Sequence, residues 1–328
     1  MNYMEDLMVG QNDKKQVLVG MSGGVDSSAA VLVLKERGYL VKGMILRMHD
    51  ENMSVEDLSN GKLPHSIWSA REAARRMRLD FTIQDVREDF RQEVIEAFLK
   101  GCEAHQIPDP CVHCCAQFLL PSLFQAAARL GCTHVASGHY AVTGFDEKRK
   151  RFVVCKGKDV QNDESHLLYR LSQEQLAWLI TPLGMYEKEE VRRIAQQARL
   201  KNAFTPDSPS ICFIPDKKYQ ELLAGKVTSK VPEGVEGPKE EESGPKVLVR
   251  AGDLCYSGIE SLPAEGMRVR ARIRNASNET DAFARIAENG TLEVQLSHSL
   301  RAAVPGQSIV LYDGDVVAMG GIIKETSC

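Results

Sequence analysis

A glycine- and serine-rich stretch near the N-terminus has the residue types of an anion-binding loop. Residues 21–28, MSGGVDSS, separate a short apolar run at 16–19 from a helix-like run at 27–37. Glycines let a backbone approach an anion closely, the first N–H groups of a helix point at it, and serine hydroxyls add donors. The stretch predicts a cradle for a pyrophosphate. It contains no Walker Gly-Lys-Ser/Thr and no G-x-G-x-x-G, and a serine-capped helix after a glycine turn is the alternative.

Cysteines are the second group of residues that could do chemistry. The chain has nine of them and no recognisable signal peptide, which disfavours a disulfide framework and favours reduced thiols. Cys111 and Cys114 form a C-x-x-C, and Cys102 and His105 form a C-x-x-H just before it. These four residues have ligand types that suit tetrahedral zinc. The alternative is that cysteines such as Cys102 are buried small hydrophobes, with a redox pair elsewhere.

The elements expected to position these residues alternate between strand and helix. Apolar runs predict strands at 16–19, 39–46, 81–86 and 133–136, and helical patterns predict helices at 27–37, 69–78, 90–103, 116–130 and 188–197. A basic run at 148–151 lies at an expected hairpin turn. The alternation predicts an α/β fold with a doubly wound parallel sheet, whose ligand lies outside the carboxyl ends of the strands.

The C-terminal part of the chain has a different character. Residues 232–246 combine Pro, Gly and Glu with almost no apolar residue, which predicts a mobile linker. Strands are then predicted at 247–250, 267–274, 281–286, 292–296, 308–312 and 316–323. Asn289-Gly290 and Asp313-Gly314 indicate hairpin turns, because both pairs tolerate positive φ. We expect a nucleotide-binding catalytic domain over 14–205, a connecting segment over 206–246 and a small antiparallel β-barrel over 247–328.

One predicted barrel strand carries an arginine at every second position: Arg268, Arg270, Arg272 and Arg274. Period two would place all four on one face, in a row of about 20 Å at ~3.3 Å per residue, long enough to follow an RNA backbone. The alternative is a solvated face paired with acids such as Asp281 or Glu293. Because the formal net charge is −4, any RNA contact must come from such local patches.

The composition bounds the class of protein. The apolar content of 43% and the charged content of 26% are those of a globular protein. The first residues are polar and acidic, and no apolar run reaches the ~18 residues of a membrane span. A cytoplasmic protein without a membrane partner is expected.

Several ordered strings together resemble the tRNA-specific 2-thiouridylases, a family of PP-loop ATP pyrophosphatases. The signature of the superfamily is matched by SGGVDSS at 22–28. The family strings are matched by SGHYA at 137–141, by PDP at 108–110 with Cys114, and by DS at 207–208 with ICFI at 211–214. Further matches are PLG at 182–184, EVR at 190–192, PGQS at 305–308 and LY at 311–312. The likeness covers roughly 14–216 and 267–323.

The resemblance implies a reaction in two stages. ATP adenylates the C2 oxygen of a wobble uridine, a persulfide on Cys212 supplies sulfur, and AMP leaves, while Cys114 acts as a nucleophile or forms a disulfide with Cys212. A thiolate suits this role once its pKa is lowered. The implied partners are tRNA and a sulfur-donor protein, either a cysteine desulfurase or a sulfur carrier. A [4Fe-4S] cluster on Cys111, Cys114 and Cys212 is the alternative.

The same resemblance assigns binding residues. Asp26 would help to hold magnesium on the pyrophosphate. ATP would contact Gly20, Met21, Ser22, Gly23, Gly24, Val25, Asp26, Ser27, Ser28, Leu46 and Gly138. The tRNA would approach Asp109, Pro110, Cys111, Asp163 and Arg274.

The chain also departs from the family pattern. The family's K-D-Q string appears as NDE at 162–164, its R-Y pair as RN at 274–275, and its glycine-rich middle ending in Y-T-I-G-Q-R is not found between Tyr219 and Ala264. Two other function classes are therefore considered. A PP-loop amide ligase explains SGGVDSS but neither Cys114 nor Cys212, and a non-catalytic sulfur-relay or RNA-binding derivative fits the shortened middle.

Overall fold

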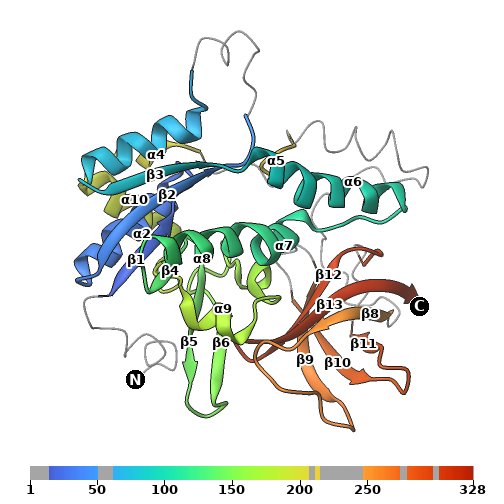
Figure 1. The fold of residues 1–328 in the computed structure, drawn as a ribbon. Coiled ribbons are helices and arrows are strands. Elements are labelled where there is room, and N and C mark those ends of the chain that lie inside the picture. Colours follow the sequence, from blue (N-terminus) through green and yellow to red (C-terminus); the bar gives the residue numbers. More distant parts are fainter. Residues whose placement is uncertain are drawn as a thin grey trace.

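The computed structural model describes residues 15–50, 62–206, 211–214, 247–273, 279–297 and 303–327. The predicted linker at 232–246 lies outside these ranges. Figure 1 shows an α/β unit, blue to yellow-green, beside a barrel that is orange to red. The α/β fold and the C-terminal barrel are both as predicted.

A five-stranded parallel sheet forms the centre of the α/β unit. Its strands, in spatial order, are β3 (Asp80–Asp85), β2 (Leu40–Arg47), β1 (Gln16–Gly20), β4 (His134–Ala136) and β7 (Leu179–Ile180). The four predicted strands are present, whereas β7 was not expected because two residues carry too little pattern. The strand order reverses between β1 and β4, and ligands of open α/β sheets bind at such a reversal.

Helices cover both faces of this sheet, because successive side chains of a strand point to opposite sides. Val17 and Val19 pack with α2 (Val25–Glu36), α4 (His65–Arg76) and α10 (Lys188–Gln197). Leu18, between them, belongs to the core on the other face, with α8 (Leu120–Arg129). The two layers of helix confirm the doubly wound arrangement.

Two long helical stretches begin earlier than predicted. The first consists of α5 (Arg87–Phe90), the π-helical turn η1 (Arg91–Ile95) and α6 (Glu96–Glu103). The second consists of α7 (Pro110–His113), the π-helical turn η2 (Cys114–Leu119) and α8. Asp109 precedes the second, and Pro110 occupies its first position, where the missing N–H of proline costs nothing. The cysteines at 111, 114 and 115 therefore lie on the opening turns of one continuous helix.

That helix, Pro110–Arg129, is long and apolar enough to cross a membrane by length and composition, and it alone has this property among the described residues. The core helix of a globular protein has the same composition. Leu120 and Leu123 are buried in the core of the α/β unit, so the apolar content of this helix is accounted for by packing.

Six antiparallel strands close into the predicted barrel. They are β8 (Val247–Cys255), β9 (Met267–Ile273), β10 (Thr280–Ile286), β11 (Leu292–Leu296), β12 (Ser308–Asp313) and β13 (Val316–Ser327). Their order is β12-β9-β10-β11-β8-β13, and pairing of β12 with β13 completes the ring. Gly290 and Gly314 have φ of +80° and +62°, which confirms the two hairpin turns.

The α/β unit and the barrel are joined by a hairpin and a shared core. The hairpin consists of β5 (Ala141–Asp146) and β6 (Arg151–Lys156), turns at the predicted basic run, and pairs with β13 through Cys155 and Val316. Val310 and Tyr312 of β12 belong to the same hydrophobic cluster as Leu18 of the parallel sheet. Between the hairpin and the barrel the chain forms η3 (Ser165–Leu168), α9 (Gln173–Trp178) and η4 (Lys201–Phe204).

The predicted arginine row on β9 is not exposed along its whole length. Arg268 and Arg270 are exposed, but Arg272 is buried and forms an ion pair with Asp163 of the α/β unit. The alternation along β9 correctly places these arginines on the outer face of the strand. At Arg272, however, the α/β unit covers that face. Arg270 pairs with Glu279 at 3.2 Å, and Arg274 lies outside the described residues.

Candidate nucleotide and thiol site

The predicted nucleotide-binding residues lie at the carboxyl ends of three neighbouring strands. Gly20 ends β1 and the loop 21–24 leads from it into α2, where residues 25–28 form the first turn. Leu46 lies near the end of β2, and Gly138 follows β4. The structure thus brings these residues together at the point where the strand order of the parallel sheet reverses.

The loop conformation depends on Gly23. Its φ is +85°, and a Cβ there would lie 2.3 Å from the carbonyl oxygen of Ser66. Ser69 Oγ donates to the Gly23 carbonyl at 2.8 Å, and Asn202 Nδ2 donates to the Gly23 and Gly24 carbonyls, both at 3.0 Å. The carbonyls of the loop are therefore held from outside by α4 and η4. Asn202 was missed from the sequence because no local pattern connects it to the loop.

The first turn of α2 presents backbone N–H groups that no side chain caps. Gly24 precedes the turn in an extended conformation and makes no side-chain cap. Such uncapped groups form the positive end of the helix dipole and bind anions. A Cβ on Gly138 would lie 2.9 Å from the Ser27 nitrogen, so the glycine is what leaves this helix end open. The arrangement fits a bound pyrophosphate.

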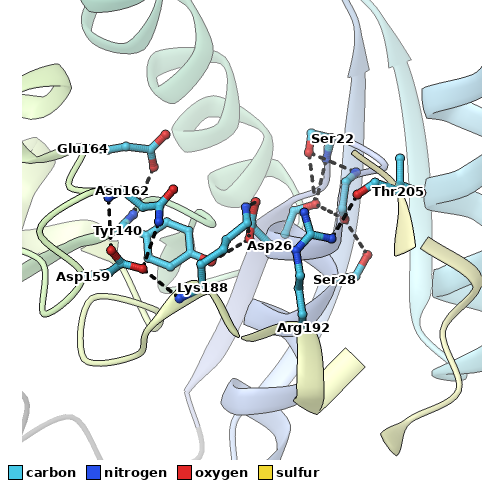
Figure 2. Close-up of polar contacts among 12 residues, drawn as sticks. Ser22, Asp26, Ser28, Tyr140, Asp159, Asn162, Glu164, Lys188, Arg192 and Thr205 are labelled. Carbon is cyan, nitrogen blue, oxygen red and sulfur yellow. Dashed lines mark hydrogen bonds and ion pairs between the residues drawn. The ribbon is translucent and has the colours of Figure 1, made fainter. Parts of the chain in front are cut away.

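Asp26 on this turn is contacted by two residues from distant elements (Figure 2). Tyr140 Oη donates to Asp26 Oδ1 at 2.7 Å, and Lys188 Nζ donates to Oδ1 at 2.9 Å and to Oδ2 at 2.7 Å. The Lys188 backbone N–H donates to Asp159 Oδ2 at 2.9 Å, which fixes the start of α10 beside the loop. Burial, and then the charge of Asp26, hold the pKa of Tyr140 far above its ordinary value, so the phenol stays a donor.

Sequence reasoning did not assign a role to Lys188 or Tyr140. Tyr140 was part of the SGHYA string, and Lys188 lies between the PLG and EVR strings, so the resemblance marked their neighbourhoods. Their partner Asp26 is 114 and 162 residues away in sequence, and no spacing rule predicts such contacts.

The helix that carries the cysteines lies next to the nucleotide loop. Cys115 Sγ is 3.6 Å from His139 Nε2, and His139 Nδ1 is 2.8 Å from Ser137 Oγ. His139 directly follows Gly138, which lies against the first turn of α2. This histidine therefore connects the opening of the cysteine helix to the anion-binding site.

Cys111, Cys114 and Cys212 lie near one another. Burial is the main cause that raises the pKa of Cys111 and Cys114, and the charge of a Cys212 thiolate raises both further, which places Cys212 within electrostatic range of the two thiols. Cys212 is exposed on a turn, 211–214, that is anchored by Phe213, whose ring centroid is 5.8 Å from those of Phe90 and Phe98. The pairing of positions 114 and 212 in one site was predicted from the resemblance alone.

The thiols are not activated in this structure. Burial raises the pKa of Cys114 to about 12. Although Cys212 is exposed as a residue, the protein packed around its thiol raises the pKa to about 11. Both are therefore protonated at neutral pH, and all cysteines in the described ranges are free thiols rather than disulfides.

The predicted metal-binding sets do not assemble. Within the residues that the structure describes, no group of three His, Cys, Asp or Glu side chains is arranged to hold a metal ion. Cys102, part of the zinc alternative, is instead buried in an apolar cluster with Phe98, Ile211 and Ile214. The iron–sulfur alternative on Cys111, Cys114 and Cys212 stays a prediction.

The residues predicted to approach tRNA fall in different surroundings. Asp109 and Pro110 begin the cysteine helix, and Cys111 is on its first turn. Asp163 is buried, and its carboxylate bonds with Arg272 and with the Gly157 backbone N–H. Arg274 is outside the described residues. Contact of these residues with RNA stays a prediction.

Two family models match this chain, one over the α/β unit and one over the barrel. Residues 15–216 match the family model described as tRNA methyl transferase HUP domain, and residues 249–323 match the aminomethyltransferase beta-barrel domain. The tRNA-specific 2-thiouridylase MnmA 2 of Caldanaerobacter subterraneus subsp. tengcongensis is 31% identical, over 94% of this chain and 98% of its own length. The chain belongs to the tRNA-specific 2-thiouridylase family. Members of this thiouridylase family are sulfurtransferases.

A second thiouridylase relative resembles this chain over nearly its whole length, whereas the likeness to a solved structure is remote. MnmA of Caldicellulosiruptor saccharolyticus is 32% identical, over 95% of this chain and 99% of its own. The alignment spans 362 positions although this chain has 328 residues, so the thiouridylase relative carries residues that are missing here. The solved U34-tRNA thiolase NcsA from Methanococcus maripaludis with its [4Fe-4S] cluster matches 68% of this chain and 69% of its own, with 14% identity and a TM-score of 0.39. That likeness is too remote to bear on the ligands of this chain.

The open helix end gives a first prediction. Gly138→Ala should weaken ATP binding by about tenfold or more, because its Cβ meets backbone and the overpacking costs ~1–3 kcal/mol. Isothermal titration with ATP measures the effect. Gly252→Ala is the control, since a Cβ there meets only the flexible end of Lys324 at 3.2 Å. Equal ATP affinity in the two variants would show that the close approach at Gly138 is not needed.

The raised thiol pKa values give a second prediction. Alkylation of Cys212 by iodoacetamide in the folded protein should accelerate about tenfold per pH unit until pH approaches 11, because only the thiolate reacts. Peptide mass spectrometry of timed samples gives the rate at this site. The same chain in guanidinium is the control and should level off near the ordinary value of about 8.5. A plateau near that value in the folded protein contradicts the burial argument.

Proposed function

We propose that this chain catalyses ATP-dependent 2-thiolation of a wobble uridine in tRNA. Family membership supports tRNA thiolation in general. The observation that carries the proposal for this chain is the 3.6 Å contact between Cys115 and His139. It joins the cysteine helix to the loop whose Gly138 lies against the first turn of α2, so thiols and anion-binding site share one edge of the sheet.

In the first step, the C2 oxygen of uridine attacks the α-phosphorus of ATP, the bond between the α- and β-phosphates breaks, and pyrophosphate leaves with the electron pair. The N–H groups of α2 and the ammonium of Lys188 stabilise the developing negative charge. Asp26 is the residue that would hold magnesium, which would neutralise the pyrophosphate. Because Lys188 bonds to Asp26, its ammonium lies within reach of phosphate bound there.

In the second step, the terminal sulfur of a persulfide on Cys212 attacks C2, and AMP leaves. The Cys114 thiolate then attacks the Cys212 sulfur, which releases thiouridine and leaves a Cys114–Cys212 disulfide. A dithiol reductant restores the two thiols. A sulfur-donor protein, such as a cysteine desulfurase or a sulfur carrier, reloads Cys212, and the reaction takes place in the cytoplasm.

The direct test is the modification itself. Nucleosides from the tRNA of cells with and without this chain are separated and analysed by mass spectrometry. Loss of 2-thiouridine in cells that lack the chain is expected. Unchanged 2-thiouridine would contradict the proposed substrate.

Lys188 gives the third prediction. Lys188→Met should reduce pyrophosphate release by about 10²–10³-fold, the usual loss when one group that stabilises transition-state charge is removed. Lys188→Arg should retain part of the rate, and Asp26→Ala should abolish magnesium-dependent AMP formation. Lys158→Met is the control. Lys158 pairs with Glu190 of α10, the helix that carries Lys188, and not with Asp26. If Lys188→Met releases pyrophosphate at the wild-type rate, as Lys158→Met should, Lys188 has no part in the first step.

The cysteines give the fourth prediction. Cys114→Ser and Cys212→Ser should each abolish thiolation and leave ATP binding intact, because the residues expected to contact ATP include neither cysteine. Cys111→Ser should keep most of the rate, since the persulfide mechanism uses only the other two thiols. Thiolated tRNA and bound iron are measured after anaerobic purification. Stoichiometric iron that is lost together with activity in Cys111→Ser would overturn the persulfide mechanism in favour of a cluster.

A further inference from the structure

A buried ion pair joins the barrel to the α/β unit. Arg272 of β9 donates through Nη1 to Asp163 Oδ2 at 2.6 Å and through Nη2 to the Asp163 carbonyl at 3.2 Å. The two side chains are 8% and 3% exposed. Asp163 belongs to the segment between β6 and η3, so the pair links units that the sequence places more than a hundred residues apart.

A second barrel strand reaches the same carboxylate. Tyr312 Oη of β12 is 3.0 Å from Ser165 Oγ, and that hydroxyl donates to Asp163 Oδ2 at 2.9 Å. The Gly157 backbone N–H donates to Asp163 Oδ1 at 2.8 Å. Both oxygens of the Asp163 carboxylate are thus hydrogen-bonded. Oδ1 accepts from the α/β unit, and Oδ2 accepts from groups of the α/β unit and of the barrel.

Such a pair fixes geometry more than it adds stability. The desolvation of two buried charges offsets most of their attraction, and apolar residues of similar size often stabilise as well. The shared apolar core, with Val310 and Tyr312 in the same cluster as Leu18, already holds the barrel in contact. The ion pair adds a directional contact, which sets how the barrel is oriented against the segment around Asp163.

The residue after Asp163 is bonded to the nucleotide site. Glu164 Oε2 accepts from the Tyr140 backbone N–H at 3.1 Å, and the Glu164 N–H donates to the Tyr140 carbonyl at 2.9 Å. Tyr140 Oη in turn donates to Asp26. Figure 2 shows Glu164, Tyr140 and Asp26 in succession, with Lys188 beside them. Consecutive residues at 163 and 164 therefore face the barrel and the ATP loop.

We propose that Asp163 and Arg272 are positioning residues that couple the seating of the barrel to the ATP site. Docking of the barrel through this pair sets the segment 163–164, and Glu164 sets Tyr140 against Asp26. A tRNA that shifts the barrel thereby changes the affinity for ATP, and ATP changes the affinity for tRNA by the same factor. The inference rests on the proposed function in taking ATP as the ligand of the loop and tRNA as the ligand that shifts the barrel.

The test uses the full chain with Arg272→Met, which removes the charge and keeps an apolar side chain of similar length. The Tyr140 amide should exchange hydrogen faster, and ATP should bind about 2- to 30-fold more weakly without tRNA, the range typical of residues that couple sites. Arg285→Met is the matched control, because this exposed barrel arginine pairs with Glu293 at 2.7 Å within the barrel. Wild-type exchange and ATP affinity in Arg272→Met would overturn the inference.

A double-mutant cycle separates positioning from general loss of stability. Arg272→Met and Tyr140→Phe should have non-additive effects on ATP affinity, because one acts through the other. Additive effects would mean that Arg272 is merely structural. If Arg272→Met fails to fold, Tyr312→Phe carries the test, since it removes only the hydroxyl that bonds to Ser165.

Failure of this inference is distinguishable from failure of the proposed function. Hydrogen exchange and ATP titration require no thiolation, so a chain that binds ATP and shows the coupling but leaves tRNA unmodified contradicts only the proposed function. If the chain thiolates tRNA normally and Arg272→Met matches Arg285→Met in hydrogen exchange and ATP affinity, only the proposed coupling between the barrel and the ATP site is contradicted.

Discussion

The uncapped N–H groups at the start of α2 are the constraint on which the site depends. They can face a ligand only if nothing else occupies the helix end, which requires glycine at 138, and only if the preceding loop is rigid. Rigidity comes from Ser69 and Asn202, which hold the loop carbonyls from α4 and η4. The loop at 21–24 is therefore local in sequence but is held in shape by side chains from α4 and η4.

The charges around this helix end explain how a carboxylate can lie in an anion site. Asp26 alone would repel ATP, but Lys188 contacts both of its oxygens. Two unit charges about 4 Å apart interact by roughly 4 kcal/mol at an effective dielectric of ~20, so the ammonium offsets much of the repulsion that the carboxylate would exert on a bound phosphate. The thiols lack such help. Among the described groups, burial raises the pKa of Cys114 and of Cys212 and no cation offsets that rise.

The parts of the fold that the sequence predicted are those encoded locally. The loop at 21–28, the parallel strands and the turns at Gly290 and Gly314 each follow from residues adjacent in the chain. The start of the cysteine helix was missed although Asp109 and Pro110 carried the signal for it. Lys188 and Asn202 could not be found, because their roles depend on contacts across the folded chain. Arg272 shows the limit of alternation, which assigns a face but not what covers that face.

In the contact between the two units, apolar packing supplies stability and a buried ion pair sets the orientation. Apolar side chains of β12 and β13 extend the core of the α/β unit, and such contacts are strong but tolerate sliding. A buried carboxylate tolerates much less, since an ion pair left unmatched inside the protein is costly. Asp163 is bonded to both units and is covalently followed by Glu164, which is bonded to Tyr140. A small movement of the barrel must therefore either break the buried pair of Arg272 and Asp163 or move Tyr140, which donates to Asp26. Moving Tyr140 disturbs fewer buried charges than breaking the ion pair.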